Sequence, residues 1–350
     1  MAVAEARGPH PLGLFLGLAM RRCADDPAWL KRILAGVRCY QQAFVLPPRP
    51  QREAVLGIGG VALRDHGGEP GGRLVVVVPS LINAPHVLDL APGRSLVEHL
   101  VQQGFRVLMV DWGNTGKGER RLGLAGLVSA RLVPLVRKLG EPVSLVGYCL
   151  GGTLALAAAC RLGPAAGRLA LIAAPWHFDG FPAPARTNAQ DVWDATRPIA
   201  RLLGALPVSL LNPLFWSLDE DAVLRKFAAL ADREPDDPAI GWFAAVEDWA
   251  NSGAPLSLPA ARDLFELGFR SDRIGRSRWV VGGLPVRPEA LSCPILDIGA
   301  TRDRIVPKSA RLRRAGVIRA DVEAGHVGMV VGNTARTGLW EPLSNWLQTA

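Results

Sequence analysis

The sequence has no apolar run of the roughly 18 to 20 residues that a membrane-spanning helix needs. Its apolar N-terminal stretch, residues 11–20 (PLGLFLGLAM), is short and is followed at once by Arg21 and Arg22. We therefore expect no transmembrane segment. We interpret residues 11–20 as an amphipathic helix packed on the body of the protein, rather than as a signal sequence or anchor. Docking of this helix to a membrane or a partner is the alternative.

Paired cysteines are also lacking. The five cysteines are scattered along the chain and form neither a CxxC pair nor a metal-ligand spacing; they are Cys23, Cys39, Cys149, Cys160 and Cys293. An odd number of unpaired cysteines indicates a reduced protein, and we expect it in the cytoplasm. The sequence indicates no metal and no bound organic cofactor.

The basic character of the chain has no nucleic-acid-binding pattern behind it. The formal net charge is +8, and the arginines that produce it are dispersed. Only residues 311–314 (RLRR) resemble a basic cluster, and no aromatic residues are interleaved with them. We therefore expect no nucleic acid as partner. The charge instead favours a phosphate-rich acyl carrier.

Strand patterns and helix patterns alternate through most of the 350 residues, and 49% hydrophobic composition supplies a large core. Continuous apolar runs of the kind buried in parallel sheets predict strands at 73–80, 105–112, 142–147, 168–175, 293–303 and 317–326. Apolar residues at helical spacing predict helices at 94–104, 126–140, 152–163, 307–316 and 334–350. Such alternation is typical of βαβ units.

Two stretches break the alternation. Residues 48–73 are interrupted by Gly and Pro and predict short antiparallel strands. Residues from about 176 to 290 are rich in tryptophan and contain no buried-strand run, which indicates a mostly helical cap insertion. The sequence thus predicts a single α/β-hydrolase domain over 1–350, with a mainly parallel central sheet and helices on both faces. Its core covers about 50–175 and 291–350, and its cap about 176–290.

The sequence GYCLG, residues 147–151, places a cysteine between glycines where a predicted strand ends and a helix begins. In a nucleophile elbow the reactive residue sits on a strained turn, and flanking glycines let the strand and helix backbones approach closely. The helix N-terminus favours a thiolate there. The N–H of Leu150 can help hold an oxyanion. We predict that Cys149 is a nucleophile, with a buried structural cysteine as the alternative.

A thiol nucleophile needs a base and a carboxylate to orient it, and in this fold the acid and then the base follow the nucleophile. Four of the six histidines precede Cys149 and a fifth precedes the resumed sheet, so His326 is the predicted base. A structural role for this histidine is the alternative. Asp303, just beyond a strand, is the predicted acid. Asp297 lies inside that strand and is interpreted as structural, whereas Asp321 is the weaker rival.

The chain resembles the polyhydroxyalkanoate synthases, especially the short class III catalytic subunits, from about residue 78 to 332. Its landmarks match in order and at compatible separations; they are VPSLINAPHVLDL (78–90), SLVEHLVQQGFRVLMVDWG (95–113), LVGYCLGGT (145–153), FAAVEDWANSGAPL (243–256), RDRIVP (302–307) and AGHVGMVVG (324–332). Two positions depart from the family pattern. Arg304 follows Asp303, where the family commonly has histidine, and Thr115 stands where a proline is usual.

The resemblance implies an acyltransferase that polymerises 3-hydroxyacyl-CoA and releases CoA, with the CoA thioester as substrate and no bound cofactor. Cys149 would carry the growing acyl chain, His326 would be its base and Asp303 the third member of the triad. The resemblance also places the second oxyanion-hole N–H at Ile82. It implies an accessory synthase subunit as partner and the polymer granule surface as a further location. The cap tryptophans fit either a cap core or the interface of a homodimer.

The choice of cysteine has a chemical reason. A cysteine that attacks an acyl-CoA exchanges one thioester for another, so the acyl group keeps its potential for transfer to a hydroxyl. The alternative function is an α/β-hydrolase, a thioesterase or esterase, that uses the same Cys-His-Asp triad to release free acid.

Overall fold

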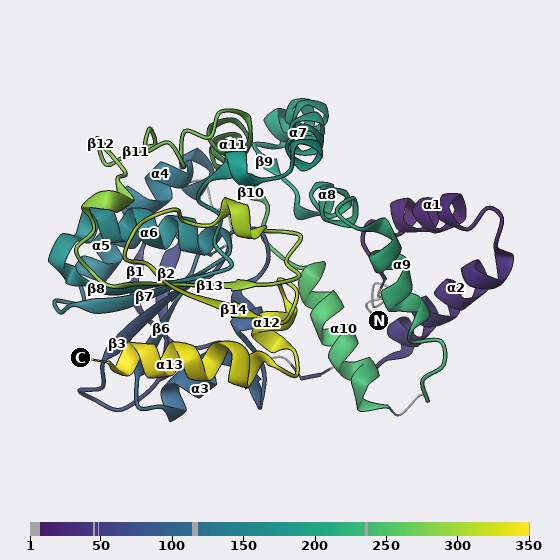
Figure 1. Ribbon diagram of the computed structural model, residues 1–350, viewed down its shortest axis with the longest axis horizontal. Helices are drawn as coiled ribbons and strands as arrows, with labels where there is room; N and C mark the ends of the chain where they lie inside the picture. The colour runs from purple at the N-terminus through teal and green to yellow at the C-terminus, as the bar shows by residue number, and fades with distance from the viewer. Residues whose placement is uncertain (1–7, 45, 48, 114–117, 235–236, 350) are drawn as a thin grey trace. The chain divides into compact units, whose positions relative to one another are not determined.

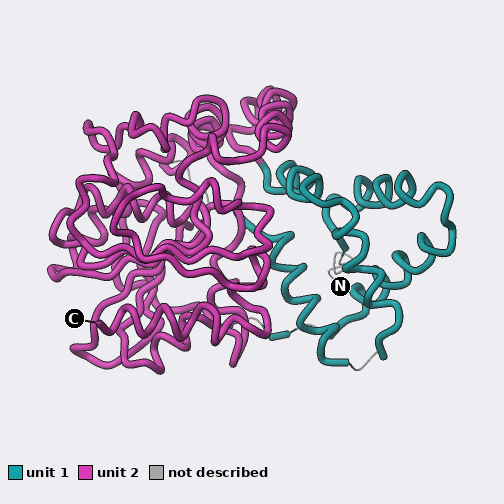
Figure 2. Tube along the Cα trace, viewed as in Figure 1, with its two compact units in different colours: residues 1–48, 207–253 teal, residues 49–206, 254–350 magenta. Residues whose placement is uncertain are grey.

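The computed structural model describes residues 8–44, 46–47, 49–113, 118–234 and 237–349. The chain forms two compact units, coloured separately in Figure 2. One unit comprises residues 1–48 and 207–253, and the other comprises residues 49–206 and 254–350. The stretch 176–290 is mostly helical and is divided between the two units. The predicted boundaries of a core and a cap stay predictions.

A twisted sheet lies at the centre of the larger unit. Its eight strands, among the residues described, are β1 (Ala54–Ile58), β2 (Val61–Gly67), β3 (Leu74–Val78), β6 (Arg106–Asp111), β7 (Val143–Tyr148), β8 (Ala166–Ile172), β13 (Ile295–Ala300) and β14 (Ile318–Val322). Their order is β1-β2-β6-β3-β7-β8-β13-β14. The strands from β6 to β14 are parallel, and β1 and β2 form the antiparallel edge predicted for residues 48–73.

Helices cover both faces of this sheet, as the apolar strands require. Every residue of β3 and of β13 is buried, which only a sheet covered on both sides achieves. In Figure 1, α3 and α13 lie on one side of the sheet and α4, α5 and α6 on the other. The helices of this unit are α3 (Leu96–Gln102), α4 (Leu124–Leu127), α5 (Val133–Arg137), α6 (Leu150–Leu162), α7 (Ala183–Leu203), α11 (Leu258–Arg262), α12 (Gly328–Val331) and α13 (Glu341–Gln348). The α/β-hydrolase fold class predicted from the sequence is therefore confirmed.

Two predicted helices are interrupted by a π-helical segment. The helix predicted at 126–140 contains such a segment at Val128–Leu132, and the final helix contains one at Arg336–Trp340. A proline follows each segment two residues later, at Pro134 and Pro342. Because proline has no N–H to donate, the helical hydrogen-bond ladder must rearrange just before it.

The prediction of a helix at residues 307–316 is wrong. The structure has only a single 3₁₀ turn there, Lys308–Ala310. The reason is Arg311, which is 5% exposed and points inward. Its Nε lies 3.0 Å from Asp297 Oδ1 and its Nη1 2.7 Å from Asp321 Oδ1. Because Arg311 binds carboxylates on the neighbouring strands β13 and β14, its backbone is held extended against the sheet. These ion pairs stabilise the extended backbone more than the spacing of the apolar residues stabilises a helix.

The smaller unit is helical and has a core of its own. Its helices are α1 (Leu12–Arg22), α2 (Pro27–Gln42), α8 (Asn212–Trp216), α9 (Glu220–Ala228) and α10 (Pro238–Ala250). Phe15 of α1 is fully buried, and its ring centroid lies 5.0 Å from that of Phe227. The amphipathic helix predicted near the N-terminus is therefore confirmed, and its apolar face packs on protein. None of the helices within the described residues combines the length and the apolar character needed to cross a bilayer.

The loop between β3 and α3 is anchored by the buried carboxylate of Asp89. Ser95 Oγ donates to Asp89 Oδ1 at 2.7 Å and accepts from the N–H of Glu98 at 2.9 Å, so it also caps α3. Arg49 Nη2 lies 3.0 Å from the same carboxylate. His66 Nδ1 lies 3.4 Å from its second oxygen. This loop carries Ile82, the predicted second donor of the oxyanion hole.

The pKa of Asp89 makes this anchor sensitive to acid. Burial alone would raise the pKa of Asp89, but the nearby His66 side chain, the hydrogen bond from Ser95 and the charge of Arg49 outweigh burial and lower the pKa to about 2. Because this folded-state pKa lies below the ordinary value of 3.8, the carboxylate stabilises the fold above about pH 4 and loses that effect as the pH falls toward 2. Asp89→Asn should therefore flatten the acid-induced fall in the free energy of unfolding, by about 2 kcal/mol between these limits in urea titrations. The exposed Asp191→Asn should keep the wild-type slope; an unchanged slope in Asp89→Asn would contradict the assignment.

Candidate active site

Cys149 lies on the sharp turn between β7 and α6, where the elbow prediction places it. Its φ is 53° and its ψ −130°, a conformation that non-glycine residues seldom adopt. The strain is held by backbone hydrogen bonds. Cys149 N–H donates to Ile172 O at 2.9 Å, and Gly152 N–H donates to Cys149 O at 2.8 Å. The side chain is only partly buried, so the sulfur is not enclosed in the core.

The flanking glycines are required by the close approach of backbones. A Cβ on Gly147 would overlap with the backbone of Gly152. A Cβ on Gly151 would overlap with the carbonyl groups of Val78 and Pro79, at the end of β3. The GxCxG pattern is thus explained by packing of α6 against two strand ends.

Asp303 and His326 form a buried pair. His326 Nδ1 lies 2.7 Å from Asp303 Oδ2, and the two side chains are 7% and 1% exposed. The other oxygen, Asp303 Oδ1, accepts the N–H groups of Ile305 and Val306, each at 2.8 Å. The two backbone donors fix the carboxylate, and the carboxylate in turn fixes the imidazole ring.

The cysteine lies beside the imidazole, since Cys149 is among the groups that raise the pKa of His326. Because Nδ1 is engaged by Asp303, Nε2 is the nitrogen available to the sulfur. Burial alone would lower the pKa of His326, but the charge of Asp303, the proximity of Cys149 and the hydrogen bond to Asp303 outweigh burial and raise the pKa. The structure therefore brings together the three side chains that the sequence predicts as a triad.

The two other aspartates considered for the acid lie elsewhere. Asp297 and Asp321 both bind Arg311, and Asp321 also accepts from Lys308 Nζ at 2.8 Å. Burial raises the pKa of Asp297 to about 6, although the charge of Arg311 opposes this. Their contacts cross-link β13 with β14, which supports the structural interpretation of Asp297.

The predicted oxyanion hole consists of the backbone N–H groups of Leu150 and Ile82, and this assignment stays a prediction. Leu150 is the first residue of α6, so its N–H has no acceptor within the helix. The N–H of Ile82 donates to Ser80 Oγ at 3.3 Å, a long hydrogen bond that a stronger acceptor can replace. The sequence analysis did not identify Trp112, whose Nε1 donates to Pro79 O at 3.0 Å and so supports this loop. Asn114 and Thr115, where the family pattern is broken, lie outside the described residues.

Tyr148 is a second residue that the sequence analysis missed. It is 2% exposed, and its ring centroid lies 5.2 Å from that of His326. Its hydroxyl donates to the backbone carbonyl of His326 at 3.4 Å. Burial raises the pKa of Tyr148 well above its usual value, so the hydroxyl stays protonated. The only signal in the sequence was its place beside Cys149, on a strand end that faces the predicted histidine loop.

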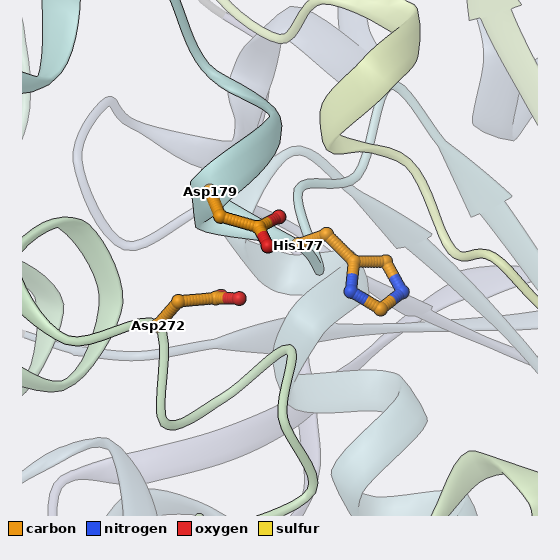
Figure 3. Close-up of side chains that lie close together, drawn as sticks. All are labelled: His177, Asp179 and Asp272. Carbon is orange, nitrogen blue, oxygen red and sulfur yellow. The ribbon is translucent and has the colours of Figure 1, made fainter. Parts of the chain in front are cut away.

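Among the described residues, one group of side chains has the composition of a metal site. His177, Asp179 and Asp272 place their ligand atoms within 4.8 Å of one another (Figure 3). Asp179 accepts from Arg313 Nη2 at 3.1 Å, and Asp272 Oδ1 accepts the N–H of Phe178 at 2.8 Å. Burial and the nearby charge of Asp179 raise the pKa of Asp272. We assign this cluster a structural role, because it joins the loop after β8 to the loop after residue 270.

The chain belongs to the alpha/beta hydrolase family, whose model matches residues 75–334. A solved structure of monoacylglycerol lipase from Paleococcus ferrophilus shares the fold, with a TM-score of 0.50 and 17% identity. That likeness covers 82% of this chain and 98% of the lipase chain, and it shows the fold alone.

Within this class the chain is similar to poly(3-hydroxyalkanoate) polymerase subunits named PhaC. It is 26% identical over 284 residues to the subunit of Haloferax mediterranei, which covers 78% of this chain and 58% of the relative. It is also 26% identical over 291 residues to the subunit of Synechocystis sp., covering 78% of this chain and 77% of the relative. The chain thus spans little more than half the length of the Haloferax protein. The resemblance inferred from the sequence motifs is confirmed.

Proposed function

We propose that this chain is an acyltransferase that polymerises 3-hydroxyacyl groups from CoA thioesters through an acyl-enzyme at Cys149. One observation carries the proposal, namely that Cys149 stands on a strained turn beside the buried, hydrogen-bonded His326–Asp303 pair. The similarity to proteins named as poly(3-hydroxyalkanoate) polymerase subunits supports the substrate class.

In the first half of the reaction, His326 Nε2 takes the proton of the Cys149 thiol, and the thiolate attacks the thioester carbonyl. The N–H groups of Leu150 and Ile82 stabilise the oxyanion that forms, the latter after it exchanges Ser80 Oγ for the substrate oxygen. The bond from carbon to the CoA sulfur then breaks, and the imidazolium returns the proton to the leaving CoA thiolate. Cys149 keeps the acyl group as a thioester.

In the second half, His326 takes the proton from the 3-hydroxyl group of another hydroxyacyl unit, and the alkoxide attacks the acyl-enzyme. The carbon–sulfur bond to Cys149 breaks, a new ester forms, and the imidazolium reprotonates the thiolate. Asp303 holds the ring so that Nε2 faces the reacting atoms in both halves, and its charge stabilises the imidazolium. Exclusion of water from the acyl-enzyme is required if polymer is to form.

A product assay tests this function. Purified protein, alone and together with an accessory synthase subunit, is incubated with 3-hydroxybutyryl-CoA, and CoA, monomeric acid and polymer are measured. We expect release of CoA together with polymer. Release of CoA with 3-hydroxybutyrate as the sole acyl product would instead establish the thioesterase alternative. Absence of CoA release in both conditions would overturn both functions and leave a binding or accessory role.

The second subunit is included because the relatives are named as polymerase subunits. If polymer forms only in the presence of the added subunit, the catalytic chain needs a partner, as the resemblance to class III synthases implies.

A further inference from the structure

A pocket of about 250 Å³ in the larger unit has an unusual excess of cationic side chains. Three arginines, two histidines and two aspartates line it, and they are Arg49, Arg52, Arg64, His66, His86, Asp89 and Asp111. Four segments of the chain meet there, namely residues 49–52, strand β2, residues 85–89 and the end of β6.

The two aspartates are neutralised by the two arginines that contact them. Arg64 Nε lies 2.6 Å from Asp111 Oδ2, and Arg49 Nη2 lies 3.0 Å from Asp89 Oδ1. Asp111 also accepts the N–H of Gly113 at 2.9 Å. The carboxylates are therefore already occupied and leave little capacity to neutralise a third guanidinium.

Arg52 is that third guanidinium. Its side chain makes no hydrogen bond or ion pair with any part of the chain that the structure describes, and its Nε is buried. A partly buried guanidinium without an acceptor lowers the stability of a fold, because the charge loses hydration without gaining a partner. Such a residue is expected where a ligand supplies the missing acceptor.

His66 adds a second unsatisfied group to the same pocket. Its side chain is 4% exposed, and its Nδ1 faces Asp89. Its Nε2 has no hydrogen-bond partner among the residues described. Arg49 Nε is a third buried nitrogen in the lining without a partner. These nitrogens are themselves covered, so the partly exposed guanidinium of Arg52 is the group that an anion in the pocket can reach. A multiply charged phosphate compensates a guanidinium more strongly than a carboxylate does.

We propose that this pocket binds a phosphate group, with the partly exposed Arg52 guanidinium as its principal contact. The pocket and the nucleophile elbow both lie at the carboxyl ends of the parallel strands, since Asp111 ends β6 and Tyr148 ends β7. Two strand spacings separate β6 from β7, which is about 10 Å. A phosphate of CoA and free inorganic phosphate share this chemistry. That CoA supplies the phosphate rests on the proposed function, whereas the binding site itself does not.

Titration calorimetry of the full chain at fixed ionic strength tests the site. The probes are CoA, inorganic phosphate and acetate, and the variants are Arg52→Gln and Arg278→Gln. Arg278 is an exposed arginine of the same unit, and its replacement controls for the loss of one positive charge. We expect Arg52→Gln to weaken binding of a phosphate probe by about tenfold or more, the value of one charge-assisted hydrogen bond. Arg278→Gln should leave that affinity within about twofold of the wild-type value.

The pattern among probes identifies the source of the phosphate. If CoA is the affected probe, the pocket takes a phosphate of the acyl carrier; if inorganic phosphate is affected to the same extent, the pocket takes the free ion. Equal affinities of wild type and Arg52→Gln for both phosphate probes would overturn the proposal. So would an equal loss in Arg278→Gln, or acetate binding as tightly as phosphate.

Neither misfolding of the variant nor turnover of the probe can be mistaken for a loss of phosphate binding in this test. Because Arg52 has no partner within the described chain, Arg52→Gln should unfold at the wild-type temperature or slightly above it. None of the three probes carries an acyl group, so binding is measured without turnover. Phosphate binding that depends on Arg52 stands even if the protein releases no CoA from a thioester, and polymerisation can be established in a protein whose pocket fails the test.

Discussion

Replacing Cys149 with alanine should reduce CoA release from 3-hydroxybutyryl-CoA by about 10⁴-fold or more, because no other group can form the acyl-enzyme. The fold should be retained, since alanine removes one sulfur atom from a partly exposed side chain and leaves the turn glycines in place. The measurement is a thiol assay for CoA, with circular dichroism to confirm the fold. Substantial CoA release by Cys149→Ala would contradict the assignment of the nucleophile.

Cys160 supplies the matched control, because it lies in the same helix, α6, and its thiol has a different environment. Burial raises the pKa of the Cys160 thiol to about 11, so almost none of it is thiolate near neutral pH. Cys160→Ala should therefore release CoA at the wild-type rate. A loss of activity in this variant similar to that of Cys149→Ala would show that the effect is not specific to the elbow.

Replacing Asp303 with asparagine should lower kcat by about a thousandfold or more, by forcing the wrong tautomer on His326. The backbone N–H groups of Ile305 and Val306 bind the Oδ1 position, so the amide oxygen of the asparagine must stay there. Its NH₂ group then faces His326 Nδ1, which has to accept a hydrogen bond. The proton moves to Nε2, where the ring can no longer accept the proton of Cys149.

Two measurements check this prediction. Loss of the Asp303 charge should lower the pKa of His326, which an NMR titration of the ring follows independently of activity. Asp321→Asn is the control, since Asp321 pairs with Arg311 and Lys308 and lies away from the ring; its kcat should change by no more than a few-fold. Equal kcat values for Asp303→Asn and the wild type would show that Asp303 is not the third member of the triad.

The parts of the structure that the sequence predicts are those with a strong local pattern. The run LVVVV of β3 is apolar at every position because it is buried on both faces, and its assignment needs no knowledge of its neighbours. The pairing of Asp303 with His326 follows from the chain order of this fold, since both residues come directly after parallel strands whose carboxyl ends meet at one edge.

The rest depends on contacts between distant residues. The helical spacing at 307–316 gave a wrong prediction because Arg311 binds carboxylates 14 and 10 residues away, on β13 and β14. The grouping of residues 207–253 with the N-terminal helices rests on side chains such as Phe15 and Phe227, which no local pattern connects. Tyr148 and Trp112 support the site through single hydrogen bonds to backbone carbonyls, and these have no sequence signature.

The most direct test of the central claim is mass spectrometry of the protein quenched in acid after brief exposure to 3-hydroxybutyryl-CoA. Our account predicts a covalent adduct whose mass corresponds to hydroxybutyryl units, located by peptide mapping on Cys149 and lost on treatment with hydroxylamine. An adduct on another cysteine, or rapid release of CoA with no adduct on Cys149 at any time, would contradict it.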